Sequence, residues 1–532
     1  MKKSKGFTLV ELLAVIVILA IILAVAIPGI GAIINSSKVS SYNSQIELFK
    51  NAASLYMAKY SDGTTTYVRL DDLIETGLIK DNVVNPVTGE PFDTNMIINT
   101  SASGNISEYE VYEGPELVTG LIPVYYDETA LVWKKADKAN NDYNWYDYNN
   151  QKWANAVTVT TGTRGAYQGK PVGTPILETD ILTYFVWIPR YKYLIPSGTG
   201  VREIKVQFET KYTPKSNGDA VSSYYTHPAF TFGDEELNGI WVGKFETTGS
   251  ATAPTIKPNV QSIRGLTVKA MYDSIKTYMQ GSSTYGFSID SDAHMMKNTE
   301  WGAAALLSGS VYGKYGNTKY DGASKEIYLN NSSLFFTGRS SGAPGGAGLL
   351  TPTYQYIGNG YYTYDGKCAT IHANLPVPCN EGSTGQVLTN KSLAFGASTT
   401  GTIYGIYDMS GSVYDCVMGL YEPNPIPSTG IYDVSGYSSP VTNAQYNLLT
   451  INTKYYDRYL TNLMSTGAIK GDATKETAYW YSDSVGFVSA NTPWFLRGAS
   501  YSSGAGAGVW NFGSNSGGTG SFSFRVVLGP QA

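Results

Sequence analysis

Glu11 is the only acid in an apolar run that begins at Phe7 and ends at Ile27, and Thr8 is the only other polar residue there. An uncompensated carboxylate costs about 2.5–3.5 kcal/mol at the centre of a membrane helix. A buried charge is tolerated when it has a partner of opposite sign and is strongly unfavourable when it has none. The chemistry expected of Glu11 is therefore a charge pair, unless its side chain lies near the membrane interface.

The chain has little material for metal or redox chemistry. Its histidines are His227, His294 and His372. They lack the spacing of metal ligands and are interpreted as ordinary core or surface side chains. Cys368 and Cys379 could close a local disulfide outside the cell, worth about 2–3 kcal/mol. The third cysteine, Cys416, has apolar neighbours and is expected to be a buried free thiol.

The apolar run is long enough to cross a membrane, because about 20 helical residues span ~30 Å of hydrocarbon. Lys2, Lys3 and Lys5 precede it, so the positive-inside rule keeps the start cytoplasmic and sends the remainder outward. The apolar part of a secretory signal is shorter, about 7–15 residues. Residues 24–26 nevertheless imitate a signal-peptidase site, and a cleaved secretory signal stays open as an alternative.

Composition favours an extracellular binding protein. A chain of 532 residues is expected to form two or three domains. The net charge of -5 gives no basic surface for nucleic acid. The 43 tyrosines and 57 glycines are typical of a β-rich recognition surface with many turns.

The pattern after the apolar run predicts that its helix continues outward and ends at residues 62–63. The residues on the predicted buried face are Tyr42, Ile46, Phe49, Ala53 and Tyr56. Residues 67–92 predict a short helix, a turn and an extended piece, and residues 99–114 alternate as a hairpin does.

Residues 121–179 are predicted to form a small aromatic β region followed by a linker. Trp133, Trp145 and Trp153 lie there among tyrosines and Asn/Asp turns. Packing of a small core is the favoured role for these rings, and a sugar-stacking face is the alternative. The stretch 161–175, rich in Gly, Thr and Pro, is interpreted as the linker.

The stretch KGFTLVELL, residues 5–13, resembles the prepilin signature of type IV pilins and the related pseudopilins. The resemblance covers roughly residues 1–60. It implies that prepilin peptidase cuts between Gly6 and Phe7, that the new N-terminus is methylated, and that the apolar helix packs in a filament with other pilin subunits. Glu11 would then pair with the positive amine of a neighbouring Phe7 and set the register of assembly. Residues 67–92 look like the small head of a Gram-positive pseudopilin.

A second resemblance runs from residue 184 to residue 528. It is carried, in order, by YFVWIPRYKY (184–193), GIWVGKFETT (239–248), MMKNTEWGAAALLS (295–308), TGTIYGIYDMSGSVYDCVMG (400–419), WFLRGASY (494–501) and SFRVVL (523–528). The first two predict strands, and the third predicts an amphipathic helix with Glu300 and Trp301 near its start. These segments resemble the formylglycine-generating enzyme family, also called the sulfatase-modifying-factor domain. Its fold is an elaborated C-type-lectin-like domain.

Most motif positions of that family are matched, and some are not. The matching residues are Gly405, Tyr407, Asp408, Met409, Gly411, Val413, Arg497, Gly498, Phe524 and Arg525. Ser412, Tyr414 and Asp415 replace the usual Asn, Trp and Glu, and Ala499 replaces a Gly. The oxidase members need two cysteines after the Arg-Gly-Gly-Ser turn, whereas this chain has none beyond Cys416. The ergothioneine-type relatives need a histidine triad from an added domain. No enzymatic activity is therefore expected.

The resemblance also implies an ion site and a ligand face. In the family, the turn corresponding to DMSGSV can hold Ca²⁺, here through the Asp408 side chain and the carbonyls of Met409, Gly411 and Val413. The alternative is that Asp408 only caps a β-turn. C-type-lectin-like relatives in phage receptor-binding proteins place their ligand face near the end of the chain. The residues this implies are Tyr501, Ser502, Ser503, Trp510, Asn511, Phe512 and Asn515. Alternation of Trp510 and Phe512 instead favours a strand in the core.

Together these features predict an α+β protein with a long N-terminal pilin helix, a small pilin-like head and a lectin-like domain with much irregular loop. The expected divisions are a leader at 1–6, a membrane and filament helix at 7–34, a pilin-like helix and head at 35–120, the aromatic region at 121–179 and the lectin-like domain at 180–532. The expected function is a minor or tip pilin that binds a glycan or protein at the cell surface, after a stage as a single-pass membrane precursor. The alternatives are a pseudopilin of a type II secretion or DNA-uptake machine and a membrane-tethered formylglycine-generating enzyme.

Overall fold

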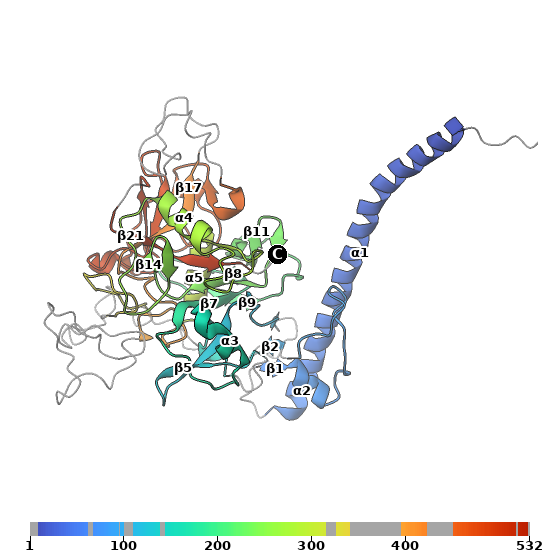
Figure 1. Ribbon diagram of the computed structural model, residues 1–532, viewed down its shortest axis with the longest axis horizontal. Coiled ribbons are helices and arrows are strands. Elements are labelled where there is room, and N and C mark those ends of the chain that lie inside the picture. The colour runs from blue at the N-terminus through green and yellow to red at the C-terminus, as the bar shows by residue number, and fades with distance from the viewer. Residues whose placement is uncertain are drawn as a thin grey trace, which may run out of the picture. The chain divides into compact units, whose positions relative to one another are not determined.

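The computed structural model describes residues 9–61, 67–94, 96–99, 110–138, 144–314, 326–340, 395–422, 451–517 and 520–529, except for the side chains of residues 9–32 and 112. The chain divides into two compact units (Figure 1). The first comprises Met1–Glu113 and Tyr212–Pro214, and the second comprises Gly114–Lys211 and Lys215–Ala532. Both units mix helix and sheet, and most strand pairs are antiparallel, so the fold class is α+β.

The first unit packs one long helix against a small sheet. Its elements are α1 (Leu9–Tyr60), β1 (Tyr67–Arg69), α2 (Leu70–Glu75), β2 (Ile97–Asn99) and β3 (Glu110–Tyr112). The three strands form an antiparallel sheet in the order β1-β2-β3. The hairpin predicted at 99–114 is confirmed in part, because β3 lies within that range and pairs with β2, which ends at Asn99. In the part of the chain whose side chains are described, which begins at residue 33, no helix is both long and apolar enough to cross a membrane.

The predicted buried face of α1 is confirmed. Tyr42, Phe49 and Ala53 are at most 2% exposed, Ile46 is also buried, and Tyr56 packs at the edge of the same core. The Phe49 ring meets Phe92 edge-on, with their centroids 5.0 Å apart. The helix therefore presents one apolar face to its own head and leaves Leu48 and Leu55 exposed on the other.

Tyr212–Pro214 belongs to this first unit although its neighbours in sequence belong to the second. The Tyr212 ring lies edge-on to that of Tyr42 at 4.8 Å, and Asn43 Nδ2 donates to the Tyr212 carbonyl at 3.3 Å. Residues far along the chain thus complete the core around α1.

The second unit is built on a seven-stranded sheet in the order β16-β22-β13-β7-β6-β4-β5, in which every neighbouring pair is antiparallel. Its strands are β4 (Ile122–Asp127), β5 (Val132–Lys135), β6 (Asn155–Val159), β7 (Ile181–Pro189), β13 (Gly239–Gly243), β16 (Ala293–Met295) and β22 (Val526–Leu528). The strand predicted at 184–193 is confirmed as two strands, β7 and β8 (Tyr191–Leu194), and the strand predicted at 239–248 is confirmed over its first half by β13.

The expected boundary at residue 180 does not divide this sheet. The region 121–179 supplies three of its strands, and β6 pairs with β7 along its whole length. Trp133, Trp145 and Trp153 are at most 2% exposed, so their role is packing and not a sugar-stacking face. The prediction that residues 161–175 form a linker is also wrong in part, because the helix α3 (Thr161–Gly169) occupies the first nine of them.

A smaller sheet has the order β18-β17-β19-β20, and β21 pairs with the other end of β17. Its strands are β17 (Tyr414–Tyr421), β18 (Asp457–Tyr459), β19 (Trp494–Arg497), β20 (Phe512–Asn515) and β21 (Phe522–Phe524). The pairs β17–β18 and β17–β21 are parallel, and the other two are antiparallel.

Short elements complete the described part of this unit. The remaining strands are β8 (Tyr191–Leu194), β9 (Lys205–Phe208), β10 (Tyr225–Thr226), β11 (Thr231–Phe232), β12 (Glu235–Glu236), β14 (Thr248–Ser250) and β15 (Ala253–Thr255). The helical elements are α4 (Val268–Tyr278), α5 (Asn298–Ser308), α8 (Met464–Gly467) and the 3₁₀ turns η2 (Tyr148–Asn150), η3 (Pro228–Phe230), η5 (Thr453–Tyr455), η6 (Trp480–Ser482) and η7 (Gly504–Gly506).

Helix α5 contacts both sheets, through β7 of the larger and β17 of the smaller. The helix predicted at 295–308 is thereby confirmed, with Glu300 and Trp301 in its first turn. The expectation that it is amphipathic is wrong, because every one of its residues is buried. It is a core helix, and its Glu300 carboxylate accepts from the Lys297 backbone N–H at 2.8 Å and so caps the first turn.

Candidate functional site

The two residues of the predicted processing site, Gly6 and Phe7, precede the part of the chain that the structure describes. Glu11 lies within α1, in the stretch whose side chains are not described. The roles predicted for these three residues therefore rest on the sequence.

The loop that follows β19 carries the exposed part of the predicted ligand face. It turns at Gly498 and Ala499, whose φ angles are 78° and 61°. The Tyr501 N–H donates to the carbonyl of Ser412 at 2.8 Å, and the Gly411 N–H donates to the carbonyl of Gly498 at 3.0 Å. Two backbone hydrogen bonds thus fix residues 498–501 against the turn before β17.

Asp408 stabilises that turn from inside. Its carboxylate accepts from Asn330 Nδ2 at 2.7 Å and from the Gly338 N–H at 2.9 Å. It is 2% exposed and has a φ of 62°. Asp408 therefore joins the segment 330–338 to the turn that supports the loop.

These contacts do not fit the calcium site implied for Asp408, Met409, Gly411 and Val413. The Asp408 oxygens face N–H donors, whereas Ca²⁺ requires oxygen ligands converging on one point. Across the described segments, no three His, Cys, Asp or Glu side chains are grouped so that they could hold a metal ion. The alternative interpretation, in which Asp408 stabilises a turn, agrees with these hydrogen bonds.

Three buried carboxylic acids of the second unit interact with Arg525. Glu246, Asp408 and Asp415 are each at most 2% exposed, and Arg525 Nη2 pairs with Asp415 Oδ2 at 3.0 Å. Burial is the main cause that raises the pKa of each of the three carboxyls. Repulsion from Asp415 raises the pKa of Glu246 and of Asp408 further, whereas Arg525 opposes the shift in all three. The pKa of Asp408 is raised to about 6.

The raised pKa of Asp408 predicts that Asp408→Asn reduces the pH dependence of stability. The folded unit binds a proton at Asp408 more tightly than the unfolded chain does, so this contribution is fully present below about pH 4 and is lost as the pH rises through about 6. Between about pH 4 and pH 7, we expect the wild type to lose more free energy of unfolding than Asp408→Asn. Urea unfolding at several pH values measures this. The control is Asp234→Asn, at an exposed aspartate of the same unit, and equal pH slopes in all three proteins would contradict the prediction.

The seven predicted ligand residues divide into two groups. Ser502 is exposed, and Tyr501, Ser503 and Asn515 are half-buried. The other residues named for the face, Trp510, Asn511 and Phe512, are at most 2% exposed.

The prediction that those three line a surface is therefore wrong. Trp510 packs edge-on against Trp480 at 5.1 Å, and Asn511 Nδ2 donates to the Gly506 carbonyl at 2.7 Å. Phe512 begins β20 and pairs with Arg497 of β19. The alternating pattern had indicated this core role.

The structure adds residues that the sequence did not indicate. The Phe335 ring meets the Tyr501 ring edge-on at 5.3 Å, and the Arg264 guanidinium lies 4.3 Å from the Phe335 centroid. The turn η6 contacts η7, which belongs to the same loop. Tyr479, the residue before η6, is 69% exposed and has a φ of 62°. No spacing in the sequence connects these residues, because they come from separate segments.

The interpretation of the histidines is confirmed for two of them. His227 Nε2 lies 2.9 Å from the Gly471 carbonyl, and His294 lies between Asp292 and Glu300, at 3.2 and 3.0 Å. Both are at most 1% exposed. Cys416 is a buried free thiol, as predicted, and burial raises its pKa. The third histidine, His372, and the pair Cys368 and Cys379 lie outside the described residues.

Comparison with known families gives a match at the start of the chain. Residues 1–27 match the family described as the Prokaryotic N-terminal methylation motif. The chain carries a type IV prepilin-like signal. The motif is that of a pilin- or pseudopilin-type surface protein, and it indicates prepilin peptidase and other pilin subunits as partners of a membrane-anchored precursor. No curated protein matches the chain.

Proposed function

We propose that this chain is a minor or tip subunit of a type IV pilus that displays its second unit for adhesion at the cell surface. The observation that carries the proposal is the methylation motif at residues 1–27 in the same chain as a unit made of Gly114–Lys211 and Lys215–Ala532. A head of this size on every subunit would crowd a helical filament. This argues for a minor or tip position and against the major pilin.

The head is proposed to be a lectin-like domain that binds a ligand and catalyses no reaction. The composition of its last segment supports this, because residues 497–528 are rich in Gly and Ser and include Tyr501, Asn511 and Asn515, residue types that are common in adaptable recognition loops. The chain also has no cysteine after Cys416, where the oxidases of the formylglycine-generating family need two. Conversion of a sulfatase-type cysteine peptide by the purified chain would contradict this part of the proposal.

Glu11→Ala is expected to abolish incorporation of the protein into filaments without preventing its insertion into the membrane. The apolar helix remains long enough to insert, but the carboxylate that would pair with a neighbouring N-terminal amine is lost. Immunoblots of sheared filaments and of membranes measure the two amounts separately.

The matched control is Glu47→Ala, because Glu47 is an exposed residue of the same helix. We expect this variant to enter filaments as the wild type does. Normal incorporation of Glu11→Ala would contradict the role of Glu11 in assembly. If the wild-type protein is itself found in membranes and never in filaments, the pseudopilin alternative is favoured.

A further inference from the structure

A cation and two aromatic rings meet beside the exposed loop of the second unit. The Arg264 guanidinium lies 4.3 Å from the centroid of Phe335, and Tyr501 lies edge-on to the same ring at 5.3 Å and 77°. Arg264 and Tyr501 are both half-buried, whereas Phe335 is 9% exposed. The Phe335 ring is therefore the buried surface against which Arg264 and Tyr501 pack, and both of these side chains reach solvent.

The charge of Arg264 is not neutralised within the described segments. Three other arginines of the unit, Arg190, Arg458 and Arg525, each pair with a carboxylate at 2.7–3.0 Å. Arg264 forms no ion pair and no hydrogen bond with any residue that the structure describes. Stacking on a ring occupies a face of the guanidinium and leaves the N–H groups at its edge free. That planar edge matches a carboxylate or sulfate in a bidentate geometry.

The supporting ring is held in an unusual backbone conformation. Phe335 has a φ of 58°, which is a strained value for a bulky residue. Its carbonyl accepts from the N–H of Ser262 at 3.1 Å and from the Ser262 hydroxyl at 3.2 Å. Such strain persists only where the surroundings fix it, and it is concentrated at ligand sites.

Hydroxyl groups lie next to these side chains. The Ser500 hydroxyl lies 3.2 Å from that of Ser502 and 3.1 Å from that of Ser503, and Ser502 is exposed. The backbone of Tyr501 between them is fixed by its hydrogen bond to Ser412. An aromatic ring, several hydroxyls and an unpaired guanidinium are the groups that recognise a sugar ring bearing an acid.

We propose that Arg264, Phe335 and Tyr501 form a binding site for an acidic glycan, one that contains a uronic acid. Arg264 binds the carboxylate through two N–H groups, Tyr501 stacks on the sugar ring, and the serine hydroxyls contact the ring hydroxyls. This inference rests on the proposed role of the head in ligand recognition and names the class of ligand.

The test compares two oligosaccharides of equal length, using the full chain in detergent. Hyaluronan oligosaccharides contain glucuronate and N-acetylglucosamine, and chitin oligosaccharides contain N-acetylglucosamine alone. We expect the wild type to bind the hyaluronan chain at least about tenfold more tightly, which corresponds to about 1.4 kcal/mol. Arg264→Gln is expected to remove that preference, and Arg264→Lys to retain only part of it, because lysine has the charge without the planar edge. Tyr501→Ala is expected to weaken binding of both oligosaccharides.

The control is Arg458→Gln, because Arg458 is a more exposed arginine that already pairs with Glu422. It is expected to bind as the wild type does, and thermal unfolding shows whether each variant is folded. Equal affinity for the two oligosaccharides, unchanged binding by folded Arg264→Gln, or no binding of hyaluronan would each overturn the inference. None of these results would affect the recovery of the protein in filaments, which tests the proposed function separately.

Discussion

Gly302→Ala is expected to lower the free energy of unfolding of the second unit by about 3 kcal/mol or more. Alanine normally stabilises a helix relative to glycine, by about 1 kcal/mol. Here a Cβ at position 302 would overlap the carbonyl oxygen of Gly471 and lie 2.9 Å from the carbonyl carbon of Asp472. Helix α5 thus packs directly on another backbone segment, and only glycine leaves room for it.

The segment opposite Gly302 cannot easily retreat. The Gly471 N–H donates to both carboxylate oxygens of Glu476, at 3.2 and 3.1 Å, and its carbonyl lies 2.9 Å from His227 Nε2. Its φ of 88° is one that L residues rarely adopt. Moving this backbone would therefore break three hydrogen bonds within the core.

Urea unfolding followed by tryptophan fluorescence measures the effect, because all nine tryptophans lie in the second unit. The matched control is Gly165→Ala in α3, where a Cβ would meet nothing within 4 Å. That substitution is expected to be neutral or to stabilise by up to about 1 kcal/mol. Similar effects of the two substitutions would contradict the packing described for α5.

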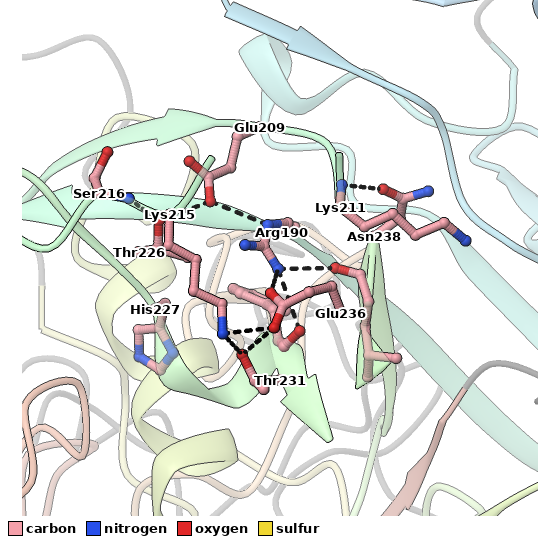
Figure 2. A network of polar contacts seen from close by, with 12 residues as sticks. Arg190, Glu209, Lys211, Lys215, Ser216, Thr226, His227, Thr231, Glu236 and Asn238 are labelled. Atoms are coloured by element: carbon pink, nitrogen blue, oxygen red, sulfur yellow. Dashed lines mark hydrogen bonds and ion pairs between the residues drawn. The ribbon is translucent and has the colours of Figure 1, made fainter. Parts of the chain in front are cut away.

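Arg190→Met is expected to destabilise the same unit by about 3–5 kcal/mol, because it leaves a buried carboxylate without its cation. Arg190 follows β7 and is completely buried. Its Nε lies 3.0 Å from Glu209 Oε1, and its Nη1 lies 2.7 Å from Glu236 Oε2 (Figure 2). Thr226 donates to the same oxygen of Glu209 at 2.9 Å.

The double variant Arg190→Met/Glu209→Gln is expected to recover part of the loss, because a neutral amide needs no countercharge. The loss in the single variant is expected to grow as the pH rises. Burial already raises the pKa of Glu209, and Arg190 is the main group that opposes this shift. Without Arg190 the pKa rises further, so stability is lost as the pH increases through it. Urea unfolding at about pH 5 and pH 8 tests both points. A single variant no less stable than the double at pH 8, or a difference between the two that does not grow from pH 5 to pH 8, would contradict them.

The helices and strands that could be predicted from the sequence are those in which the spacing of apolar residues shows which side chains are buried. The spacing of Tyr42, Ile46 and Phe49 gives the buried face of α1, and the aromatic run after Ile181 gives β7. The burial of α5 on every side could not be predicted in this way. Its alanine and leucine residues are apolar enough to be core, and only the contacts of α5 with both sheets show that opposite sides of the helix are covered.

Helix α3 was not predicted because its glycines favour a loop, and the contacts that stabilise the helix come from residues outside it. Its glycines are typical of a loop, but its C-terminal carbonyls are satisfied by one lysine. Lys135 Nζ donates to the carbonyls of Tyr167 and Gln168, at 3.2 and 2.7 Å. Arg164 of the same helix donates to the carbonyl of Ser283 at 2.9 Å.

The candidate site was predicted only in part, for a similar reason. Tyr501 and Ser502 follow from composition and from the family resemblance. Arg264 and Phe335 belong to separate segments, and only Phe335 contacts Tyr501 directly. The segment of Phe335 and the loop of Tyr501 are held by hydrogen bonds to Asp408 and Ser412. Such long-range contacts leave no periodic signal in a single sequence.

N-terminal mass spectrometry of protein recovered from sheared surface filaments tests whether this chain is processed as a prepilin and displayed on a pilus. We predict a methylated N-terminal peptide that begins at Phe7. Recovery only from membranes with Met1 retained, or in the medium with a start at Ile27, would contradict prepilin processing with display on a pilus and the role assigned to Glu11.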